Sequence, residues 1–167
     1  LYIPLSQRVK LTGGIDYRSS KSDQQYISIS NFGPYKTNYA NDSLHQNQLG
    51  VYAAMNLNTV QGFSLELGGR VNVHSEYGSH LVFNINPSYL VNKQVKLFAN
   101  LSSAFRTPSL YQLFSEYGNK GLDPESGLTG EAGIQYFFAN NKFTARAVAF
   151  SRKVTDVIFF LYNPVTF

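Results

Sequence analysis

Cysteine and tryptophan are absent from the 167 residues, and charged residues are scarce. Without cysteine the chain forms neither a disulfide framework nor cysteine-ligated metal sites, although this does not fix its compartment. Asp, Glu, Lys and Arg together make up only 14% of the sequence, well below the roughly 25% of ordinary soluble domains. The net charge is +4, but Lys and Arg are scattered along the chain. The dense basic stripe of a nucleic-acid-binding surface is therefore missing, and we expect no nucleic-acid partner.

Long hydrophobic runs are missing as well. The longest apolar stretch, Val157–Tyr162, falls far short of the about 20 residues that a membrane-spanning helix needs. The chain has no methionine at position 1 and no leader of the secretory type, which indicates a processed product or an excised piece. If such a chain crosses a membrane, it does so with strands.

Aromatic and neutral polar residues take the place of charge. Twelve tyrosines and thirteen phenylalanines raise the aromatic content to 15%, and polarity is carried by Asn, Ser, Gln and Thr. The two classes alternate with the period of a β-strand. The alternating stretches are residues 8–18, 46–57, 63–74, 81–91, 96–106, 128–138 and 142–152, and residues 1–3 have the pattern of a strand's tail. A polar face opposite an apolar, aromatic face is what a wall between lipid and a wet lumen requires.

Connections between these stretches alternate in length. Short turns at 58–62, 92–94 and 139–141 are interleaved with a long polar insert at 19–45, a moderate loop at 75–80 and a long loop from 107. Membrane barrels have short periplasmic turns and longer extracellular loops. Strands of about 11 residues at about 3.3 Å each, tilted near 40°, span about 28 Å, which matches an apolar band of about 25 Å.

The sequence thus predicts an all-β fold, an antiparallel up-and-down transmembrane β-barrel segment of about seven strands of a larger barrel, with residues 1–167 forming one partial barrel. Four charged residues are expected to face the lumen and to form ion pairs or hydrogen bonds along its wall: Glu66, Arg70, Arg106 and Glu131. Aromatic residues near the strand ends predict two interfacial girdles. One comprises Phe63, Tyr89, Tyr136 and Phe138 beside the short turns, and the other Tyr17, Tyr77 and Phe105 near the long loops.

Aromatic residues also recur within the two longest loops. Their flat apolar faces and polar tips suit a bulky amphipathic ligand, although they equally suit the packing of loops against each other. The candidate ligand-binding residues are Tyr26, Tyr35, Tyr39, Tyr111, Phe114, Tyr117 and Asn119. Within 109–117, the residues Leu110, Leu113, Phe114 and Tyr117 share a helical face, which fits one helical turn or a packed bend.

Catalytic and metal-binding patterns are not found. His45, His74 and His80 lack ligand spacing, and no nucleophile motif or phosphate-binding loop accompanies them. We expect no enzyme activity, no metal site and no cofactor.

One stretch resembles a known family. AFRTPSLYQLF at 104–114, YGNKGLDPES at 117–126 and GEAG at 130–133 resemble the barrel signature of TonB-dependent outer-membrane receptors over about 30 residues. The resemblance implies a bacterial outer-membrane location, lipid contact and energy-coupled uptake of a scarce, large nutrient. It also implies a lumen-filling plug domain, absent here, through which the periplasmic TonB protein acts. Seven strands do not close a barrel of about 22, so the segment alone is not expected to transport.

The loop sequence YGNKGLDPES is similar to the cobalamin-receptor branch of that family. Cobalamin (vitamin B12) is therefore the ligand that the resemblance favours, while siderophore and haem receptors share much of the same loop. A soluble all-β binding or adhesion module is the alternative from another class, because alternation defines two faces without saying which is inside. Detergent dependence distinguishes a receptor segment from such a module.

Overall fold

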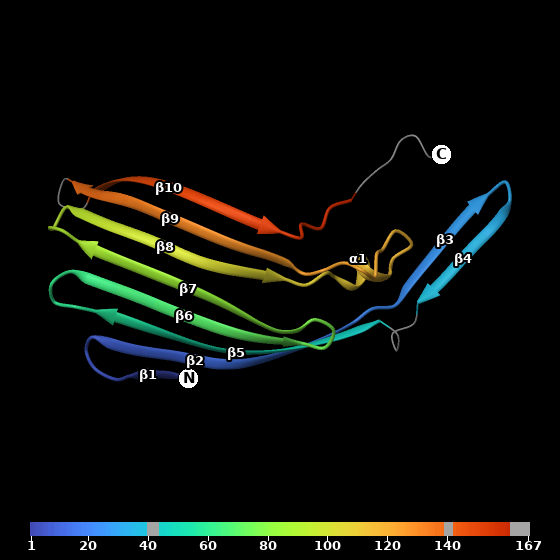
Figure 1. Cartoon of the computed structure of the whole chain (residues 1–167), viewed down its shortest axis with the longest axis horizontal. Coiled ribbons are helices and arrows are strands. Elements are labelled where there is room, and N and C mark those ends of the chain that lie inside the picture. Colours follow the sequence, from blue (N-terminus) through green and yellow to red (C-terminus); the bar gives the residue numbers. More distant parts are fainter. Residues whose placement is uncertain (40–43, 139–141, 161–167) are drawn as a thin grey trace.

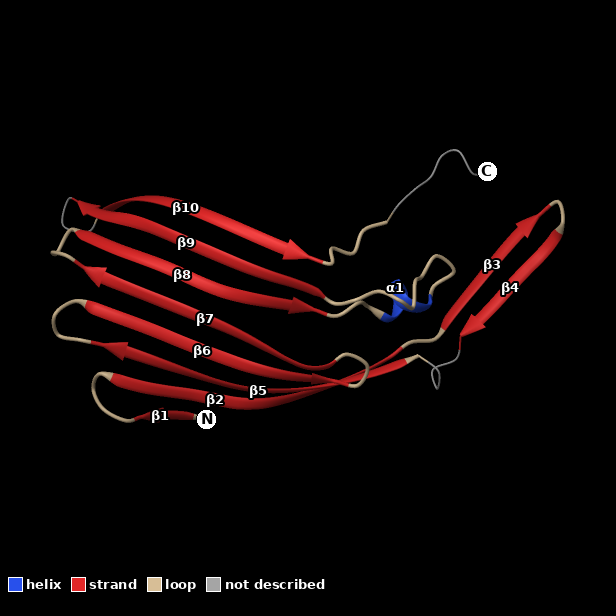
Figure 2. Cartoon of the chain, viewed as in Figure 1, coloured by secondary structure: helices blue, strands red, loops and turns tan. Residues whose placement is uncertain are grey.

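The computed structural model describes residues 1–39, 44–138 and 142–160, and nearly all of them lie in antiparallel strands (Figure 1). The main sheet has eight strands in the order β1-β2-β5-β6-β7-β8-β9-β10. Their bounds are β1 Tyr2–Pro4, β2 Val9–Lys21, β5 His45–Asn58, β6 Phe63–His74, β7 Gly78–Leu90, β8 Val95–Arg106, β9 Glu125–Phe138 and β10 Phe143–Thr155. A separate hairpin joins β3 Gln24–Ser30 to β4 Gly33–Tyr39, and a short helix, α1, spans Leu110–Phe114 (Figure 2).

All seven stretches with alternating residues are long strands, and the expected antiparallel up-and-down segment is confirmed. Strands β5 to β10 follow one another in the sheet as they do in the chain, and β2 pairs directly with β5. The turns after β5 and β7 lie at one end of the sheet, whereas α1 and the β3-β4 hairpin lie at the other (Figure 1). The described strands form an open sheet with β1 and β10 at its edges. The predicted turn at 139–141 lies outside the described residues.

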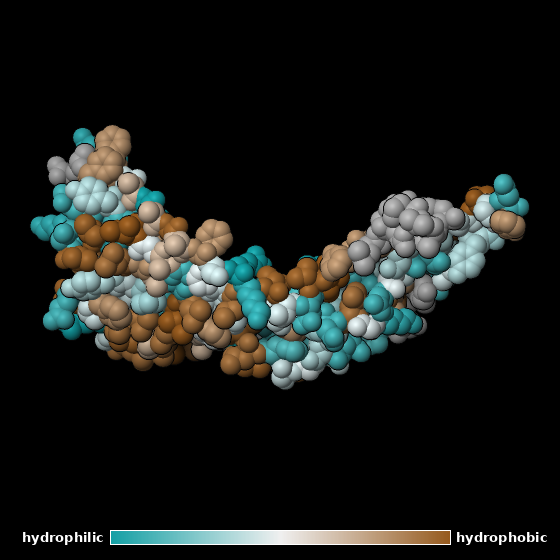
Figure 3. Space-filling model, turned by 45° about the horizontal axis from the view of Figure 1, so that its top comes forward, coloured by the Kyte–Doolittle hydropathy of each residue, from teal (hydrophilic) through white to brown (hydrophobic). Residues whose placement is uncertain are grey.

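The pairing register sorts the side chains of the sheet into a polar face and an apolar face. Glu66 lies opposite Asn56 on one side and Asn86 on the other, while the neighbouring Leu67 lies opposite Met55 and Ile85. The apolar face has no protein cover in the described residues, where the buried hydrophobic side chains are Leu44, Leu110 and Leu113, all at the loop end. Figure 3 shows hydrophobic residues gathered over the strands and a more hydrophilic surface toward the β3-β4 hairpin.

Two connections differ from the expectation. Residues 75–80 were expected to form a moderate loop, but β7 begins at Gly78, because the positive φ of 70° at Gly78 closes a tight turn and pairs it with His74. The insert at 19–45 is not an irregular loop. It contains β3 and β4, whose hairpin turns at Gly33 with φ 103°.

Strands β7 and β8 separate toward the loop end of the sheet. Their register includes Ser88 opposite Phe98 and Ile85 opposite Leu101, but between them it skips Asn86 and Pro87, of which the proline has no N–H to donate. Beyond Asn84 the ladder stops, and the Phe83 N–H donates to the Ser103 Oγ at 2.9 Å. No helix among the described residues is long and apolar enough to cross a membrane.

Candidate ligand-binding site

The loop between β8 and β9 folds around α1. The Ser109 Oγ accepts from the Gln112 N–H at 3.2 Å and the Gln112 Oε1 accepts from the Ser109 N–H at 2.9 Å, which forms a capping box. Leu110 and Leu113 of the helix are buried, with only 8% and 6% of their surface exposed. The predicted single helical turn is therefore present, and burial of its two leucines holds it against the end of the sheet.

Two polar contacts fasten this loop to the end of the sheet, and an ion pair joins β8 to β9 at its base. At its base, the Arg106 Nη1 lies 3.1 Å from the Glu125 Oε2. The Tyr77 hydroxyl, in the β6-β7 turn, donates to the Leu122 carbonyl at 3.2 Å, and the Gln46 Nε2 of β5 lies 3.5 Å from the Pro108 carbonyl. Burial raises the pKa of Tyr77, and the carboxylates of Glu76 and Asp123 raise it further, so this hydroxyl stays protonated at neutral pH.

The Tyr-Gly-Asn part of the loop has a structural role. A Cβ on Gly118 would lie 2.7 Å from the Leu113 carbonyl carbon, so the loop passes directly beneath α1 only because no side chain is there. The Asn119 Oδ1 accepts from the Gly121 N–H at 2.9 Å, and the Asn119 N–H donates to the Gln112 carbonyl at 2.9 Å. Asn119 was a candidate for ligand contact, but its side-chain oxygen is engaged within the loop.

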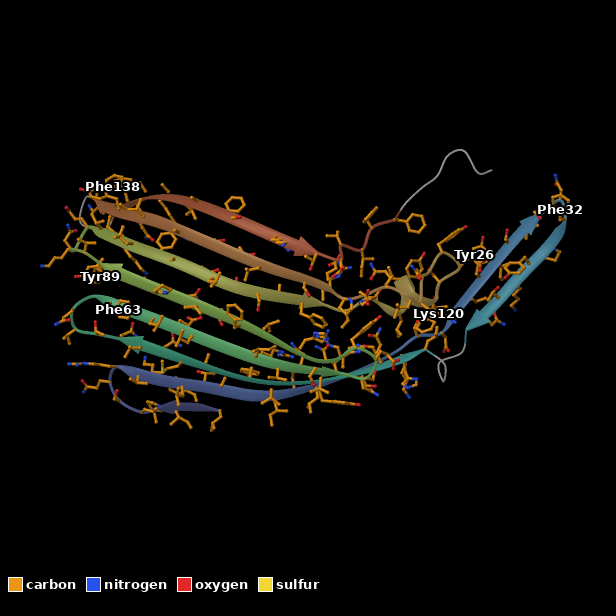
Figure 4. All side chains as sticks on the ribbon, in the orientation of Figure 1. Tyr26, Phe32, Phe63, Tyr89, Lys120 and Phe138 are labelled. Carbon is orange, nitrogen blue, oxygen red and sulfur yellow. The ribbon has the colours of Figure 1, made fainter. Side chains whose placement is uncertain are left out.

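Four aromatic rings from three separate segments meet at the loop end of the sheet. Tyr26 of β3 packs edge-on against Tyr35 of β4 and Tyr117 of the β8-β9 loop, with centroid distances of 6.3 and 6.2 Å. Tyr117 also contacts Phe160, which follows β10, at 6.0 Å. Figure 4 shows Tyr26 at the end of the molecule opposite Phe63, Tyr89 and Phe138. We call Tyr26, Tyr35, Tyr117 and Phe160 the aromatic cluster.

The Tyr26 and Tyr117 hydroxyls lie 3.4 Å apart. This hydrogen bond and the charge of Tyr26 raise the pKa of Tyr117. We expect Tyr26→Phe to return the Tyr117 pKa toward its ordinary value of about 10, whereas Tyr35→Phe leaves it raised. Because a raised pKa marks a contact made by the neutral phenol, the contact holds below pH about 10 and is lost as pH rises through the raised pKa.

Alkaline ultraviolet difference spectra of the two variants and the wild type measure this change. An identical titration of Tyr117 in all three proteins contradicts the hydroxyl contact.

The other candidate residues lie apart from the aromatic cluster. Tyr111 is 65% exposed and lines a pocket of about 380 Å³ on the polar face of the sheet. Phe114 lies beneath Lys120, whose Nζ is 5.4 Å from the ring centroid. Tyr39 lies in β4 opposite Gln24, and its side chain is outside the described residues. Tyr26, Tyr35 and Tyr117 of the cluster were ligand-binding candidates from the sequence, but Phe160 was not, because the phase of the chain beyond β10 was unclear.

Below the loops, the predicted lumen-facing residues share the polar face. The Arg70 Nη1 of β6 reaches across β5 to the Asp16 Oδ1 of β2 at 2.7 Å. It passes over Gly50, where a Cβ would lie 2.1 Å from the guanidinium. The Glu66 Oε1 accepts from Asn84 and Asn86 at 3.1 and 3.2 Å.

Other glycines on this face have the same role. Tyr52 lies over Gly14, Asn84 over Gly68 and Phe98 over Gly133, and each would clash with a Cβ there. Large side chains therefore lie flat against the polar face instead of projecting from it. Glu131 lines a further pocket of about 410 Å³ near the short turns. Arg146 borders it, 4.2 Å above the Phe98 ring.

Two of the three histidines make contacts with protein side chains. The His74 Nε2 lies 2.9 Å from the Gln46 Oε1, and the His80 ring stacks on Phe105 at 3.6 Å. Across residues 1–39, 44–138 and 142–160, no three His, Asp or Glu side chains form a group that could hold a metal ion.

Comparison with known proteins gives one family. The family described as "TonB dependent receptor-like, beta-barrel" matches residues 3–167. Among solved structures, the ferric enterobactin receptor of Pseudomonas aeruginosa superposes with a TM-score of 0.74 at 23% identity, over 92% of this chain and 25% of the receptor. The siderophore receptor PirA of the same organism gives 0.69 at 22% identity, over 92% and 29%. A copper transporter gives 0.65 at 15% identity, over 89% and 28%. The chain spans about a quarter of the length of these structures.

Proposed function

The chain belongs to the TonB-dependent receptor β-barrel family, whose members are bacterial outer-membrane proteins, and we propose that it is part of a receptor that imports a scarce, large nutrient. The family is one of receptors and transporters, not of enzymes. The proposed partners are outer-membrane lipid, the nutrient itself and the TonB protein, which acts through a plug domain outside this segment.

We propose that the polar face lines the lumen and that the apolar face contacts lipid. Leu101 and Ile134, in the middle of β8 and β9, are 41% and 45% exposed with no protein cover in the described part of the chain. Glu66, Arg70, Arg106 and Glu131 all lie on the opposite face. A hydrophobic band around a polar interior is the arrangement that a membrane barrel needs.

The aromatic cluster is the observation that carries the ligand-binding proposal. Three segments distant in sequence bring their rings together at the end of the sheet that has the longer connections. Exposed tyrosine rings suit flat aromatic groups on a ligand. Tyr117 is 63% exposed and Tyr35 54%, so both remain accessible.

The ligand class that we propose first is a ferric siderophore. Its support is that solved structures similar to this chain include a ferric enterobactin receptor and a siderophore receptor. Cobalamin remains the second candidate on the resemblance of YGNKGLDPES. The loop-folding roles of Gly118 and Asn119 weaken that choice, because receptors for different ligands need the same loop fold.

Binding by the full-length receptor in detergent tests the proposal. We expect ferric enterobactin to bind with a Kd in the nanomolar range expected of a scavenging receptor, and cyanocobalamin and haemin not to compete. Preferential binding of cyanocobalamin supports the proposed receptor function but shows that the ligand is cobalamin and not a ferric siderophore. Binding of none of the three, by a protein that stays monodisperse without detergent, contradicts the receptor and favours a soluble all-β binding or adhesion module.

A further inference from the structure

Glu125 is the first residue of β9, at the base of the β8-β9 loop, and its carboxylate has two partners. The Glu125 Oε2 accepts from the Arg106 Nη1 at 3.1 Å, and the Glu125 Oε1 accepts from the Ile158 N–H at 2.8 Å. Only 14% of the Glu125 side chain is exposed. The carboxylate therefore joins the end of β8 to the segment that follows β10, residues 156–160, through two charge-assisted hydrogen bonds.

The bond to Ile158 continues the attachment of the chain to β9 where the ladder between β9 and β10 ends. The last pair of that ladder is Thr155 opposite Ser126. The next residue, Asp156, has a φ of 56°, a left-handed conformation that turns the chain out of the strand. Beyond this turn, the Glu125 side chain holds the backbone of the segment to the end of β9.

The segment 156–160 carries one ring of the aromatic cluster. Phe160 lies two residues beyond Ile158, and its ring centroid is 6.0 Å from that of Tyr117, at an interplanar angle of 78°. Phe160 is 70% exposed and Tyr117 63%, so the position of each ring depends on how its backbone is held. Tyr117 lies in the loop whose base is closed by the Arg106–Glu125 pair, and Phe160 in the segment that Glu125 holds.

We propose that Glu125 is a positioning residue for the ligand site. Its carboxylate fixes the β8-β9 loop and the segment 156–160 relative to each other, and it thereby places Phe160 against Tyr117. The inference rests on the proposed receptor function and deepens it, because it gives a largely buried residue outside the aromatic cluster an effect on affinity. Without the carboxylate, the segment separates from the loop and the ligand loses the Phe160 ring.

Hydrogen exchange of the ligand-free, full-length receptor in detergent tests the contact itself. We expect Glu125→Ala to speed the exchange of the Ile158 amide about tenfold to a hundredfold, as the loss of a hydrogen bond to a charged group does. Glu125→Gln, which keeps one acceptor oxygen, gives a smaller increase and serves where Glu125→Ala does not fold. Glu116→Ala is the matched control, because it removes an exposed carboxylate from the same loop, and exchange at Ile158 stays at the wild-type rate.

Affinity then separates positioning from a purely structural role. The probe is ferric enterobactin, or cyanocobalamin if the wild type prefers it, and the variants are Glu125→Ala, Phe160→Ala and the two combined. We expect each single substitution to raise the Kd about threefold to tenfold, the contribution of one aromatic contact. The combined variant is expected to match Phe160→Ala within about twofold, because Glu125 acts through Phe160. Glu116→Ala keeps the Kd within about twofold of the wild type.

Two results overturn the inference while leaving the receptor function intact. One is an unchanged exchange rate of the Ile158 amide in Glu125→Ala, which contradicts the contact. The other is a fully additive loss of affinity in the combined variant, which shows that Glu125 stabilises the fold without acting through Phe160. Failure of the wild type to bind ferric enterobactin, haemin and cyanocobalamin overturns the receptor function and this inference together.

Discussion

Leu101→Arg is expected to destabilise the folded receptor in phospholipid vesicles by about 2–4 kcal/mol, the cost of a cation on the lipid face near the bilayer midplane. Leu101 lies at the middle of β8, on the apolar face, opposite Ile85 and Gly130. Its neighbours on that face, Ala99 and Ser103 in β8 with Ile85 and Gly130 opposite, are uncharged, so a guanidinium there has no counter-charge. The midpoint of guanidinium-induced unfolding of the full-length receptor measures the change.

Ser102→Arg is the matched control, because Ser102 has the same depth in β8 but points to the polar face. There an arginine reaches water and nearby amides, and the change removes only the hydrogen bond from the Ser102 Oγ to the Asn100 Oδ1 at 3.1 Å. We expect a cost of about 1 kcal/mol or less. If Ser102→Arg proves the more costly of the two, the lipid and lumen faces are the reverse of those proposed.

The strands were predictable because a sheet with different surroundings on its two faces imposes a period of two on the sequence. Leu65, Leu67 and Val71 alternate with Glu66 and Arg70, and β6 has the corresponding faces. Charge scarcity and the alternation of turn lengths then identified the class of fold. Both signals are local, so they are visible in the sequence without knowledge of distant contacts.

The β3-β4 hairpin was missed because its polar, tyrosine-rich sequence resembles that of an irregular loop. Ile27 and Ile29 alternate with Tyr26 and Ser28, but both faces of the hairpin are largely exposed, so the alternation is not between apolar and polar. The pattern that reveals a half-buried strand is weak where neither face is buried.

Contacts between distant segments were equally inaccessible to the sequence. The Arg70–Asp16 ion pair spans three strands and depends on Gly50 having no side chain. Tyr117 meets Phe160 only because β9 and β10 return the chain to the same end of the sheet. Such contacts follow from register and curvature, whereas the sequence order of the residues gives no hint of them.

Gly118 gives the second large effect, because the loop that carries Tyr111 and Tyr117 depends on it. A Cβ there would lie 2.7 Å from the Leu113 carbonyl carbon, 2.8 Å from the Leu113 oxygen and 2.8 Å from the Phe114 nitrogen. These are backbone atoms of α1 and cannot rotate away. We expect Gly118→Ala to cost the docked loop about 1–3 kcal/mol, as overpacking does.

Limited proteolysis of the full-length receptor measures this cost directly. Cleavage within residues 107–124 tracks the population of the opened loop, so it is expected to rise by about fivefold to more than a hundredfold. The affinity for ferric enterobactin falls in parallel, although Gly118 offers no side chain to a ligand. Gly121→Ala is the control in the same loop, since its Cβ would meet only the Asn119 side-chain oxygen at 3.3 Å.

A parallel loss of loop protection and affinity in Gly118→Ala means that the ligand needs the loop docked against β5 and the β6-β7 turn. Increased cleavage with unchanged affinity means instead that the docked loop, with Tyr111 and Tyr117, contributes nothing to binding. Unchanged cleavage shows that α1 shifts to accept a methyl group, and it contradicts the account of Gly118 as the residue that lets the loop pass beneath the helix.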